Sequence, residues 1–511
     1  MRTNTILIAA ALSLFMIPAC DMVPEDAEEG LAVEQMILHV SEDGEMPATG
    51  YEIVRTRTAQ LSVEFFPETA LDTDYIWITS DPDIVSVSET GLMTALAEGE
   101  AIVGAELVNG RKRAVANVLV TPYVAENPIK SITLSETQHD FTDISDAPVT
   151  LAATLEATDP DVPVTIETVK WSSSDLFVVQ VSDAGEVRII GGGEATVRCE
   201  AIDGGGAFAE CRFTVPGNEI KDALYDMTGP QFDDGYYKKT YGQIEIEVPV
   251  LDRTGARTGA TEIQTWLDRN LGAERRATES APGMNDAYKD SLSFGSLFQW
   301  SRKADGHEKV KWSEILGENG RGYTLTDYVT VKAADRRDAG HSSFISVSYD
   351  WAENTKESFW GGSQYTIAST GTATEEQFTN MSHAAPLDDP AQANNPCPYG
   401  YRVPTIVEFH QLVAAVAGLD KLVYNTNGNS MANATETMAN NPPYIPFSGN
   451  RANTDVGYET ISNLGGWIML WTNSAQSDNN GWPMRIQNTG NNFRIAGQHK
   501  ANGYPVRCIK D

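Results

Sequence analysis

The sequence predicts a multidomain protein in which two all-β sandwiches are followed by an α+β domain. At 511 residues the chain is too long for one hydrophobic core, so roughly three or four domains are expected. Short alternating strands separated by Gly, Asp and Ser occur in two similar blocks near the N-terminus, and a well-marked helix appears only later. We place the sandwiches at residues 33–122 and 128–216, a linker at 217–240 and the last domain at 241–511.

The N-terminus has the parts of a secretory signal peptide, which we expect over residues 1–19. The apolar run from Ile6 to Ile17 is too short to span a bilayer. An aliphatic residue, Pro and Ala stand directly before Cys20, and this arrangement resembles the lipobox of bacterial lipoproteins, whose cysteine receives the lipid. We therefore expect lipidation at Cys20, an acidic tether over residues 20–32, and a surface-exposed protein on the outer membrane. An ordinary signal peptide with an incidental cysteine is the alternative.

Four further cysteines form an even set, which in an exported protein indicates two disulfides. Four cysteines allow three pairings. Their spacing favours Cys199–Cys211, across a Gly-rich hairpin turn, and Cys397–Cys508. No CxxC motif occurs, so the sequence gives no basis for a zinc or thioredoxin-like site.

The two sandwich blocks repeat one motif. The stretch from Trp77 to Gly91 matches the stretch from Trp171 to Gly185, with a constant offset of 94 residues. The residues that both copies share, W-x-x-S-D-x-x-x-V-x-V-S-x-x-G, resemble the bacterial Ig-like domain of group 2. This resemblance implies Ig-like sandwiches that serve mostly as stalks, and we expect both tryptophans to lie in the core.

The last domain combines strands with helices. We predict a strand over Gln243–Leu251 and a helix over Ser293–Lys303. Thr405 and Glu408 form a capping box that predicts a second helix, ending at Gly418. Short strands are expected over Gly466–Trp471, Trp482–Gln487, Phe493–Ala496 and Tyr504–Ile509.

Six motifs occur in a fixed order in this domain. They include WLDRNL from Trp266, FGSLFQW from Phe294, CPYGYRVPT from Cys397 and the terminal GYPVRCIKD from Gly503. Together they resemble the Fibrobacter succinogenes major paralogous domain, which implies a C-type-lectin-like α+β fold but little chemistry. Residues 320–396 depart from the pattern, and we interpret them as an insertion with its own strands.

No sequence motif indicates catalysis. The histidines show no HxxxH pair and no carboxylate at metal-ligand spacing, and the polar stretch from Arg302 to Glu308 is interpreted as a solvated helix end. We therefore expect no enzyme activity, no metal and no cofactor. A secreted hydrolase is the third and weakest of the functions considered. Trp471 and Asn473 echo half of the calcium-dependent sugar motif of animal lectins, which leaves calcium open.

The stretch from Trp471 to Asn492 is the best candidate for ligand binding, because aromatic faces and amides suit sugars or protein partners. We expect Trp471 in the core. Asn479, Asn480 and Trp482 are placed in a loop as candidate ligand-binding residues, with simple turn residues as the alternative.

Charge narrows the function. A net charge of −34 excludes nucleic acid as a partner and argues against docking on anionic lipid. The leading hypothesis is a cell-surface lipoprotein that presents a lectin-like binding tip on an Ig-like stalk, for adhesion to an extracellular glycan or protein. The alternative is a structural or accessory subunit of a surface or fimbrial assembly, without a ligand of its own.

Overall fold

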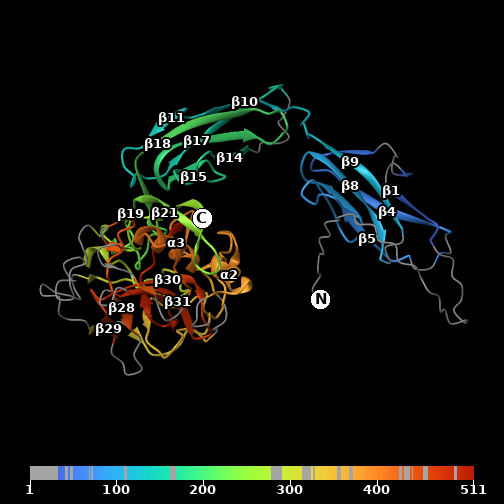
Figure 1. Cartoon of the computed structure of the whole chain (residues 1–511). Coiled ribbons are helices and arrows are strands. Elements are labelled where there is room, and N and C mark those ends of the chain that lie inside the picture. The colour runs from blue at the N-terminus through green and yellow to red at the C-terminus, as the bar shows by residue number, and fades with distance from the viewer. Residues whose placement is uncertain are drawn as a thin grey trace, which may run out of the picture. The chain divides into compact units, whose positions relative to one another are not determined.

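The fold is described from a computed structural model of the chain (Figure 1). The signal peptide, Cys20 and the acidic tether lie outside the described residues. Within the described part of the chain, no helix is long and apolar enough to cross a bilayer. The described residues are 33–40, 44–45, 50–67, 70, 73–108, 112–161, 169–277, 291–312, 324–325, 328–353, 358–367, 372–424, 429–430, 438–439, 441–452, 459–487 and 492–511.

Contacts divide the chain into two compact units. The N-terminal unit contains the first sandwich and one end of the second, and the C-terminal unit contains the rest of the second sandwich together with the last domain. The N-terminal unit comprises residues 1–130, 157–168 and 202–206, and the C-terminal unit comprises residues 131–156, 169–201 and 207–511.

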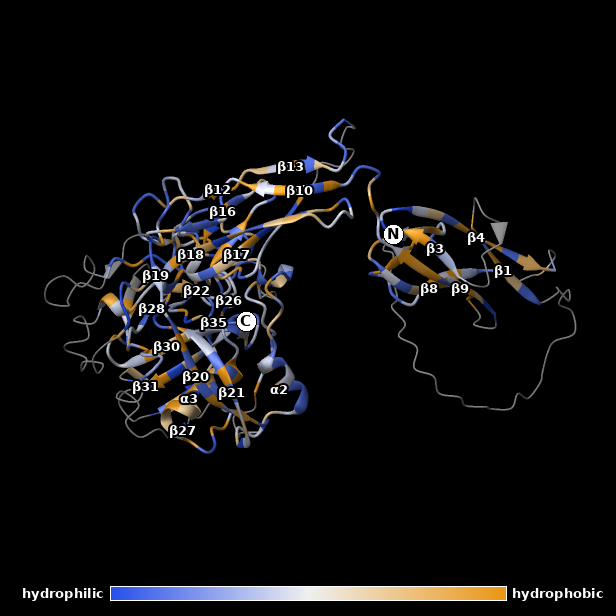
Figure 2. Ribbon diagram, turned by 90° about the horizontal axis from the view of Figure 1, so that it is seen from above, coloured by the Kyte–Doolittle hydropathy of each residue, from blue (hydrophilic) through white to orange (hydrophobic). Residues whose placement is uncertain are grey.

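The first sandwich is formed by β1 (Gln35–Val40), β2 (Gly44–Glu45), β3 (Tyr51–Val54), β4 (Thr58–Phe66), β5 (Tyr75–Thr79), β6 (Val85–Val87), β7 (Leu92–Ala95), β8 (Gly99–Leu107) and β9 (Arg113–Thr121). One sheet has the order β2-β1-β4-β7-β6 and the other β3-β9-β8-β5, in which β3 runs parallel to β9. Alternate residues of β8 and β9 face inward, where Val103 and Val118 are fully buried. A hydrophobic stretch in β8 is visible in Figure 2.

The second sandwich repeats this pairing pattern with the sheets β10-β13, β12-β16-β15 and β11-β18-β17-β14. Here β11 runs parallel to β18, as β3 does to β9. The strands are β10 (Ile129–Leu134), β11 (Gln138–Asp140), β12 (Val149–Thr150), β13 (Ala153–Ala157), β14 (Val169–Ser173), β15 (Val179–Val181), β16 (Glu186–Ile189), β17 (Gly191–Ala201) and β18 (Phe208–Lys221).

The repeated Trp and Gly of the sequence motif touch each other in both sandwiches. A β-carbon added to Gly91 would lie 2.7 Å from the ring of Trp77, and one added to Gly185 would lie 3.0 Å from the ring of Trp171. Only glycine permits this close approach between the turn and the indole. Both rings are half-buried, and Trp77 packs against the core of its sandwich, as expected.

Cys199 and Cys211 are buried free thiols, so the predicted disulfide between them is wrong. Cys199 of β17 lies opposite Ala209, and Cys211 of β18 lies opposite Val197. The two cysteines are therefore diagonal neighbours, about 7–8 Å apart in a regular sheet. A disulfide requires Cα atoms closer than about 7 Å.

Residues 217–240, which we expected to be a linker, are packed into the C-terminal unit. Strand β18 extends to Lys221 and pairs with β19 (Thr240–Tyr241). Ile220 and Tyr241 are buried in the same cluster as Leu267 and Tyr401 of the last domain. The second sandwich and the last domain therefore share a hydrophobic core.

The last domain is rich in short strands, with the sheets β20-β21-β35-β26, β22-β34-β28-β29-β23, β27-β32-β31-β30 and β24-β25. Its elements are β20 (Gln243–Leu251), β21 (Arg257–Leu267), β22 (Phe298–Gln299), β23 (Thr324–Leu325), β24 (Tyr328–Val329), β25 (Phe344–Ile345), α2 (Glu375–Ser382), η2 (Pro390–Gln392), β26 (Tyr401–Arg402), α3 (Ile406–Ala417), β27 (Asn429–Ser430), β28 (Asn450–Ala452), β29 (Glu459–Ser462), β30 (Trp467–Ala475), β31 (Asn480–Gln487), β32 (Asn492–Ile495), β33 (Gln498–His499), β34 (Gly503–Tyr504) and β35 (Ile509–Lys510).

The beginning and the end of this domain are joined. Trp266 of β21 pairs with Ile509 of β35. The predicted disulfide between Cys397 and Cys508 is confirmed, with the Cα atoms 5.9 Å apart. The bond ties the segment before β26 to the residue that precedes β35.

One of the two predicted helices is confirmed. Helix α3 begins after the Thr405–Glu408 capping box and ends at Gly418, as predicted. The helix predicted over Ser293–Lys303 is wrong, because this segment contains β22, which pairs with β34. Its apolar residues are buried in two different clusters, so packing from two sides overrides the helical periodicity.

Candidate functional site

The predicted ligand site at Asn479, Asn480 and Trp482 is wrong for its aromatic member. Trp482 is fully buried in β31, and its Nε1 donates a hydrogen bond to the carbonyl of Tyr365 at 3.1 Å. Asn480 begins this strand and is half-buried, whereas Asn479 lies exposed in the preceding turn. Residues 481–484 of β31 are all buried, so Trp482 is enclosed whichever face it occupies, and Trp471 is buried as expected.

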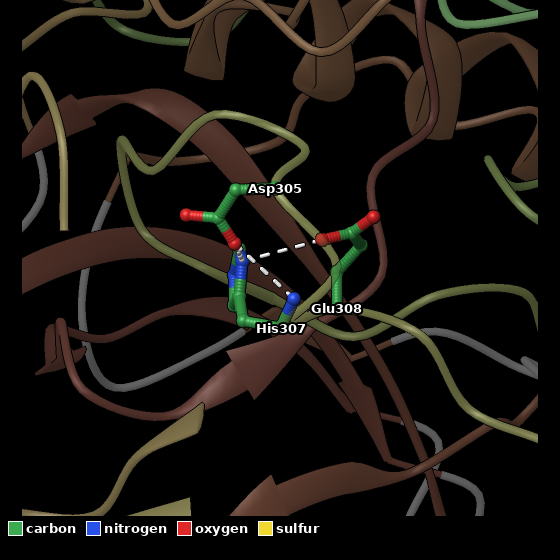
Figure 3. A group of neighbouring side chains, drawn as sticks. All are labelled: Asp305, His307 and Glu308. Carbon is green, nitrogen blue, oxygen red and sulfur yellow. Dashed lines mark hydrogen bonds and ion pairs between the residues drawn. The ribbon is translucent and has the colours of Figure 1, made fainter. Parts of the chain in front are cut away.

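The polar stretch from Arg302 to Glu308 is not a solvated helix end. Arg302, His307 and Glu308 are buried, and donor atoms of Asp305, His307 and Glu308 lie within 4.8 Å of one another. Figure 3 shows both carboxylates joined to His307. Sequence spacing missed this cluster because the loop folds back on itself after β22.

Every polar atom of this cluster already has a partner on the protein. His307 Nδ1 lies 2.7 Å from Asp305 Oδ1 and 3.2 Å from Glu308 Oε2, while Nε2 accepts a hydrogen bond from the Gln299 amide at 3.0 Å. Because Nε2 is an acceptor, the neutral imidazole carries its proton on Nδ1.

The carboxylates are satisfied in the same way. Asp305 Oδ2 accepts from Arg302 Nε at 2.8 Å. Glu308 accepts from the hydroxyl of Tyr237 and from the Gly306 amide. Burial would raise the pKa of Asp305, but His307 and Arg302 outweigh it and hold that pKa below its usual range. A metal ion would have to displace these contacts, so the geometry favours a structural network that anchors Tyr237 of the 217–240 segment.

A pocket of about 500 Å³ lies where the second sandwich meets the last domain, within the C-terminal unit. We name it the Tyr399 pocket. It is lined by Phe177, Leu387, Asp388, Asn395, Cys397, Pro398, Tyr399, Gly400, Tyr401 and Asp511. Its volume falls in the range of sites for small ligands.

The walls of the Tyr399 pocket are held by several independent constraints. Cys397 is fixed by its disulfide, and the Asp511 amide donates to the Gly400 carbonyl at 3.0 Å. The ring of Phe177 occupies the space where a β-carbon on Gly400 would lie, only 2.0 Å away. The hydroxyl of Tyr401 donates to Gln243 Oε1 at 2.7 Å. The pocket is therefore preorganised.

The open part of the Tyr399 pocket combines an aromatic ring with acceptor groups. The side chain of Tyr399 is 43% exposed, and the carboxylates of Asp388 and Asp511 are exposed as well. Nearby cations are engaged by residues of the pocket wall: Arg402 Nε donates to Asp511 Oδ1 at 2.7 Å, and Lys510 Nζ lies 4.0 Å above the Phe177 ring. The lining residues contain no histidine and no free thiol.

The sequence did not predict this pocket, although one of the motifs singled out in the last domain forms part of its wall. The CPYGYRVPT motif contains five of the lining residues, from Cys397 to Tyr401. The remaining walls come from Phe177, from Leu387, Asp388 and Asn395, and from Asp511, which only the fold brings together.

The first sandwich, which contains the Trp77–Gly91 contact, matches a known protein family. Residues 49–118 match the bacterial Ig-like domain (group 2). The first sandwich is thus an Ig-like domain of this group. A comparison with curated proteins found no match. None of the residues that line the Tyr399 pocket falls within this Ig-like domain.

Solved structures with partial similarity include domains 4 and 5 of the S-layer protein SbsC, at 16% identity and a TM-score of 0.15, covering 37% of this chain and 100% of that chain. A mutant intimin of EHEC O157:H7 is 14% identical with a TM-score of 0.14, over 19% of this chain and 51% of that chain. Drosophila N-cadherin EC1-4 is 12% identical with a TM-score of 0.16, over 35% of this chain and 50% of that chain. The chain spans 38% of a longer SbsC chain. We draw neither fold nor function from likenesses at these TM-scores.

Proposed function

We propose that this protein is a surface-anchored lipoprotein that binds a neutral saccharide in the Tyr399 pocket and so serves adhesion. One observation carries the proposal: an exposed tyrosine ring stands beside carboxylates in a preformed pocket of about 500 Å³. Aromatic faces stack on the apolar faces of sugar rings, and carboxylate and amide oxygens accept hydrogen bonds from hydroxyl groups.

Charge supports a neutral ligand over an anionic one. Asp388 and Asp511 line the pocket, and Arg402 is held by Asp511 and by Glu408, whose Oε1 lies 2.7 Å from Arg402 Nη2. Arg402 is shared between two carboxylates, so with Asp388 the charge beside the pocket stays negative, and an acidic sugar would be repelled by a chain whose net charge is −34.

The rest of the chain is proposed to display this pocket. We propose that residues 128–216 are a second group 2 Ig-like domain, which the matched strand pairing and the Trp171–Gly185 contact support. We further propose a C-type-lectin-like tip for the last domain, supported by the joining of its first strands to its last and by the Cys397–Cys508 bond. The two Ig-like domains would then act as a stalk.

The binding proposal is tested on a glycan array. The Cys20→Ser protein, purified from the soluble fraction, is applied to arrays of neutral and sialylated or sulfated glycans. We expect binding to a subset of neutral glycans. Binding confined to anionic glycans, or to none, would contradict the proposal.

The anchor is tested separately, because it rests on the lipobox alone. Wild-type protein should fractionate with the outer membrane, incorporate labelled palmitate and be digested by protease added to intact cells. Cys20→Ser should lose both the label and the membrane association. Retention of the variant on the membrane would refute lipid anchoring at Cys20 while leaving the glycan result intact.

A further inference from the structure

The first Ig-like domain carries aliphatic side chains on the outer face of its sheet β3-β9-β8-β5. Ile76 is 50% exposed, Ile102 45%, Val115 46% and Leu119 38%, and Ile78 is half-buried beside them. We call these five residues the apolar stripe. Single exposed aliphatics are ordinary on protein surfaces, whereas a contiguous group marks a contact surface.

Strand register shows that the apolar stripe is contiguous. Ile78 lies opposite Gly104, and Gly104 lies opposite Val115, so only a glycine separates these two side chains. Ile102 and Leu119 follow on the same face, because Ile102 pairs with Asn117, two residues before Leu119. The stripe thus crosses three neighbouring strands, β5, β8 and β9.

The second sandwich provides an internal comparison. All five equivalent positions of the second sandwich are polar or charged. Lys170 and Ser172 correspond to Ile76 and Ile78, Thr196 corresponds to Ile102, and Glu210 and Thr214 correspond to Val115 and Leu119. The same fold thus forms with a polar outer face. The aliphatic residues of the first domain are therefore not required by the architecture, and they cover no core of their own.

The charged side chains on the polar outer face of the second sandwich pair with one another. Arg198 pairs with Glu210 at 3.2 Å, and Arg212 pairs with Glu194 at 2.6 Å. The Arg198 guanidinium lies 3.5 Å from the ring centroid of Phe208 and partly covers that ring, which stays 49% exposed. No such cover is present over the apolar stripe among the described residues.

The border of the apolar stripe is acidic. Glu52, Glu100 and Glu106 share its face, and among the described residues of the paired strands the one cation on this face is Arg113, opposite Glu106. Two such faces would repel each other, and anionic lipid would be repelled in the same way. Charge complementarity instead selects a surface whose apolar centre is bordered by Lys or Arg.

We propose that the apolar stripe is the docking surface for a protein partner that presents aliphatic side chains bordered by basic residues. The first Ig-like domain then has a binding role of its own, beyond holding the Tyr399 pocket away from the cell. This inference is independent of the saccharide proposal, because the stripe and the pocket lie in different domains.

The test uses a fluorescent β-hairpin peptide with a Leu/Val face bordered by Lys, and a twin with Glu in place of every Lys. Binding to the full chain is followed by fluorescence anisotropy. We expect the Lys peptide to bind and the Glu peptide to fail. The variant Ile78→Ser/Ile102→Thr/Leu119→Thr gives the first domain the residues found at the equivalent positions of the second sandwich, without changing the net charge. We expect this variant to bind the Lys peptide roughly tenfold or more weakly than wild type.

The matched control is Ser172→Ala/Thr196→Ser/Thr214→Ser, which alters the same positions of the second sandwich and should bind like wild type. Ile102→Thr alone replaces the triple variant if circular dichroism shows that the triple variant is unfolded. Equal binding to stripe variant and wild type, equal binding of both peptides, or no binding at all would overturn the proposal. A wild-type dimer in sedimentation that the stripe variant abolishes would also overturn it, since the occupant would then be a second copy.

Discussion

Phe177 of the second sandwich and Tyr399 of the last domain pack edge to face, with their ring centroids 5.8 Å apart. This contact forms one wall of the Tyr399 pocket and part of the boundary between the second sandwich and the last domain. Because the two share a core, we expect them to unfold as one cooperative unit and the first Ig-like domain to unfold separately.

Gly400→Ala tests this shared boundary. The added methyl would collide with the Phe177 ring at 2.0 Å, at a position with φ of +75°. Gly235→Ala is the matched control, because its φ is +73° and no atom lies within 4 Å of the added methyl. Backbone strain costs about 1 kcal/mol in both, and overpacking adds about 1–3 kcal/mol for Gly400→Ala alone.

The measurement is scanning calorimetry of the full chain. Gly400→Ala should lower the transition of the C-terminal unit clearly more than Gly235→Ala does, and the transition of the first Ig-like domain should not move. Separate melting of the second sandwich and the last domain, with the sandwich untouched by the substitution, would contradict a shared core.

The cysteines offer a second prediction. Burial raises the pKa of both Cys199 and Cys211 to about 11, so these thiols should be unreactive in the native protein at neutral pH. After unfolding without reductant, two thiols per mature chain should react with Ellman's reagent when Cys20 is lipidated or replaced. Peptide mapping should find Cys397 joined to Cys508. A linked Cys199–Cys211 peptide would show that the register of β17 and β18 differs from the one described.

These outcomes show what local sequence signals can and cannot supply. Strand β20 and helix α3 were predicted correctly, since alternation and a capping box act within a few residues. The Cys199–Cys211 pairing failed because a hairpin turn does not by itself fix register to the residue. A shift of two positions keeps the faces and moves the partners.

The candidate site shows the same limit. The Asn-rich sequence beside Trp482 suggested an exposed loop. Strand β31 begins at Asn480, however, and the indole of Trp482 is buried. The Tyr399 pocket could not be derived from composition, because Phe177 and Asp511 reach it from segments far apart in the sequence. The repeat of two sandwiches was readable because the Trp–Gly contact has a fixed sequence spacing in both.

A third prediction concerns pH. Burial raises the pKa of Asp222 from 3.8 to about 6, against hydrogen bonds donated by the Tyr241 hydroxyl and the Leu224 amide. A carboxyl whose pKa is higher in the folded than in the unfolded state favours folding below about pH 4, and this contribution is lost as the pH rises through 6. The loss amounts to at most about 3 kcal/mol.

Relative to Asp222→Asn, the wild-type C-terminal unit should therefore lose stability as the pH rises from 4 to 6. The difference between wild type and variant is the quantity to measure, by denaturant unfolding at each pH. It removes the opposing effect of buried His410, whose pKa is lowered by burial to about 4. Identical slopes for both proteins would show that Asp222 does not titrate in this range.

The most direct test of the account is the affinity of Tyr399→Ala for a neutral saccharide selected on the array, measured by titration calorimetry. Tyr349→Ala is the matched control, because Tyr349 is an exposed tyrosine of the same domain, 52% accessible, that does not line the pocket. We predict that Tyr399→Ala weakens binding roughly tenfold or more, with only the small fall in melting temperature that loss of the Phe177 contact brings, while Tyr349→Ala binds like wild type. Wild-type affinity in Tyr399→Ala, or an equal loss in both variants, would show that the saccharide binds elsewhere.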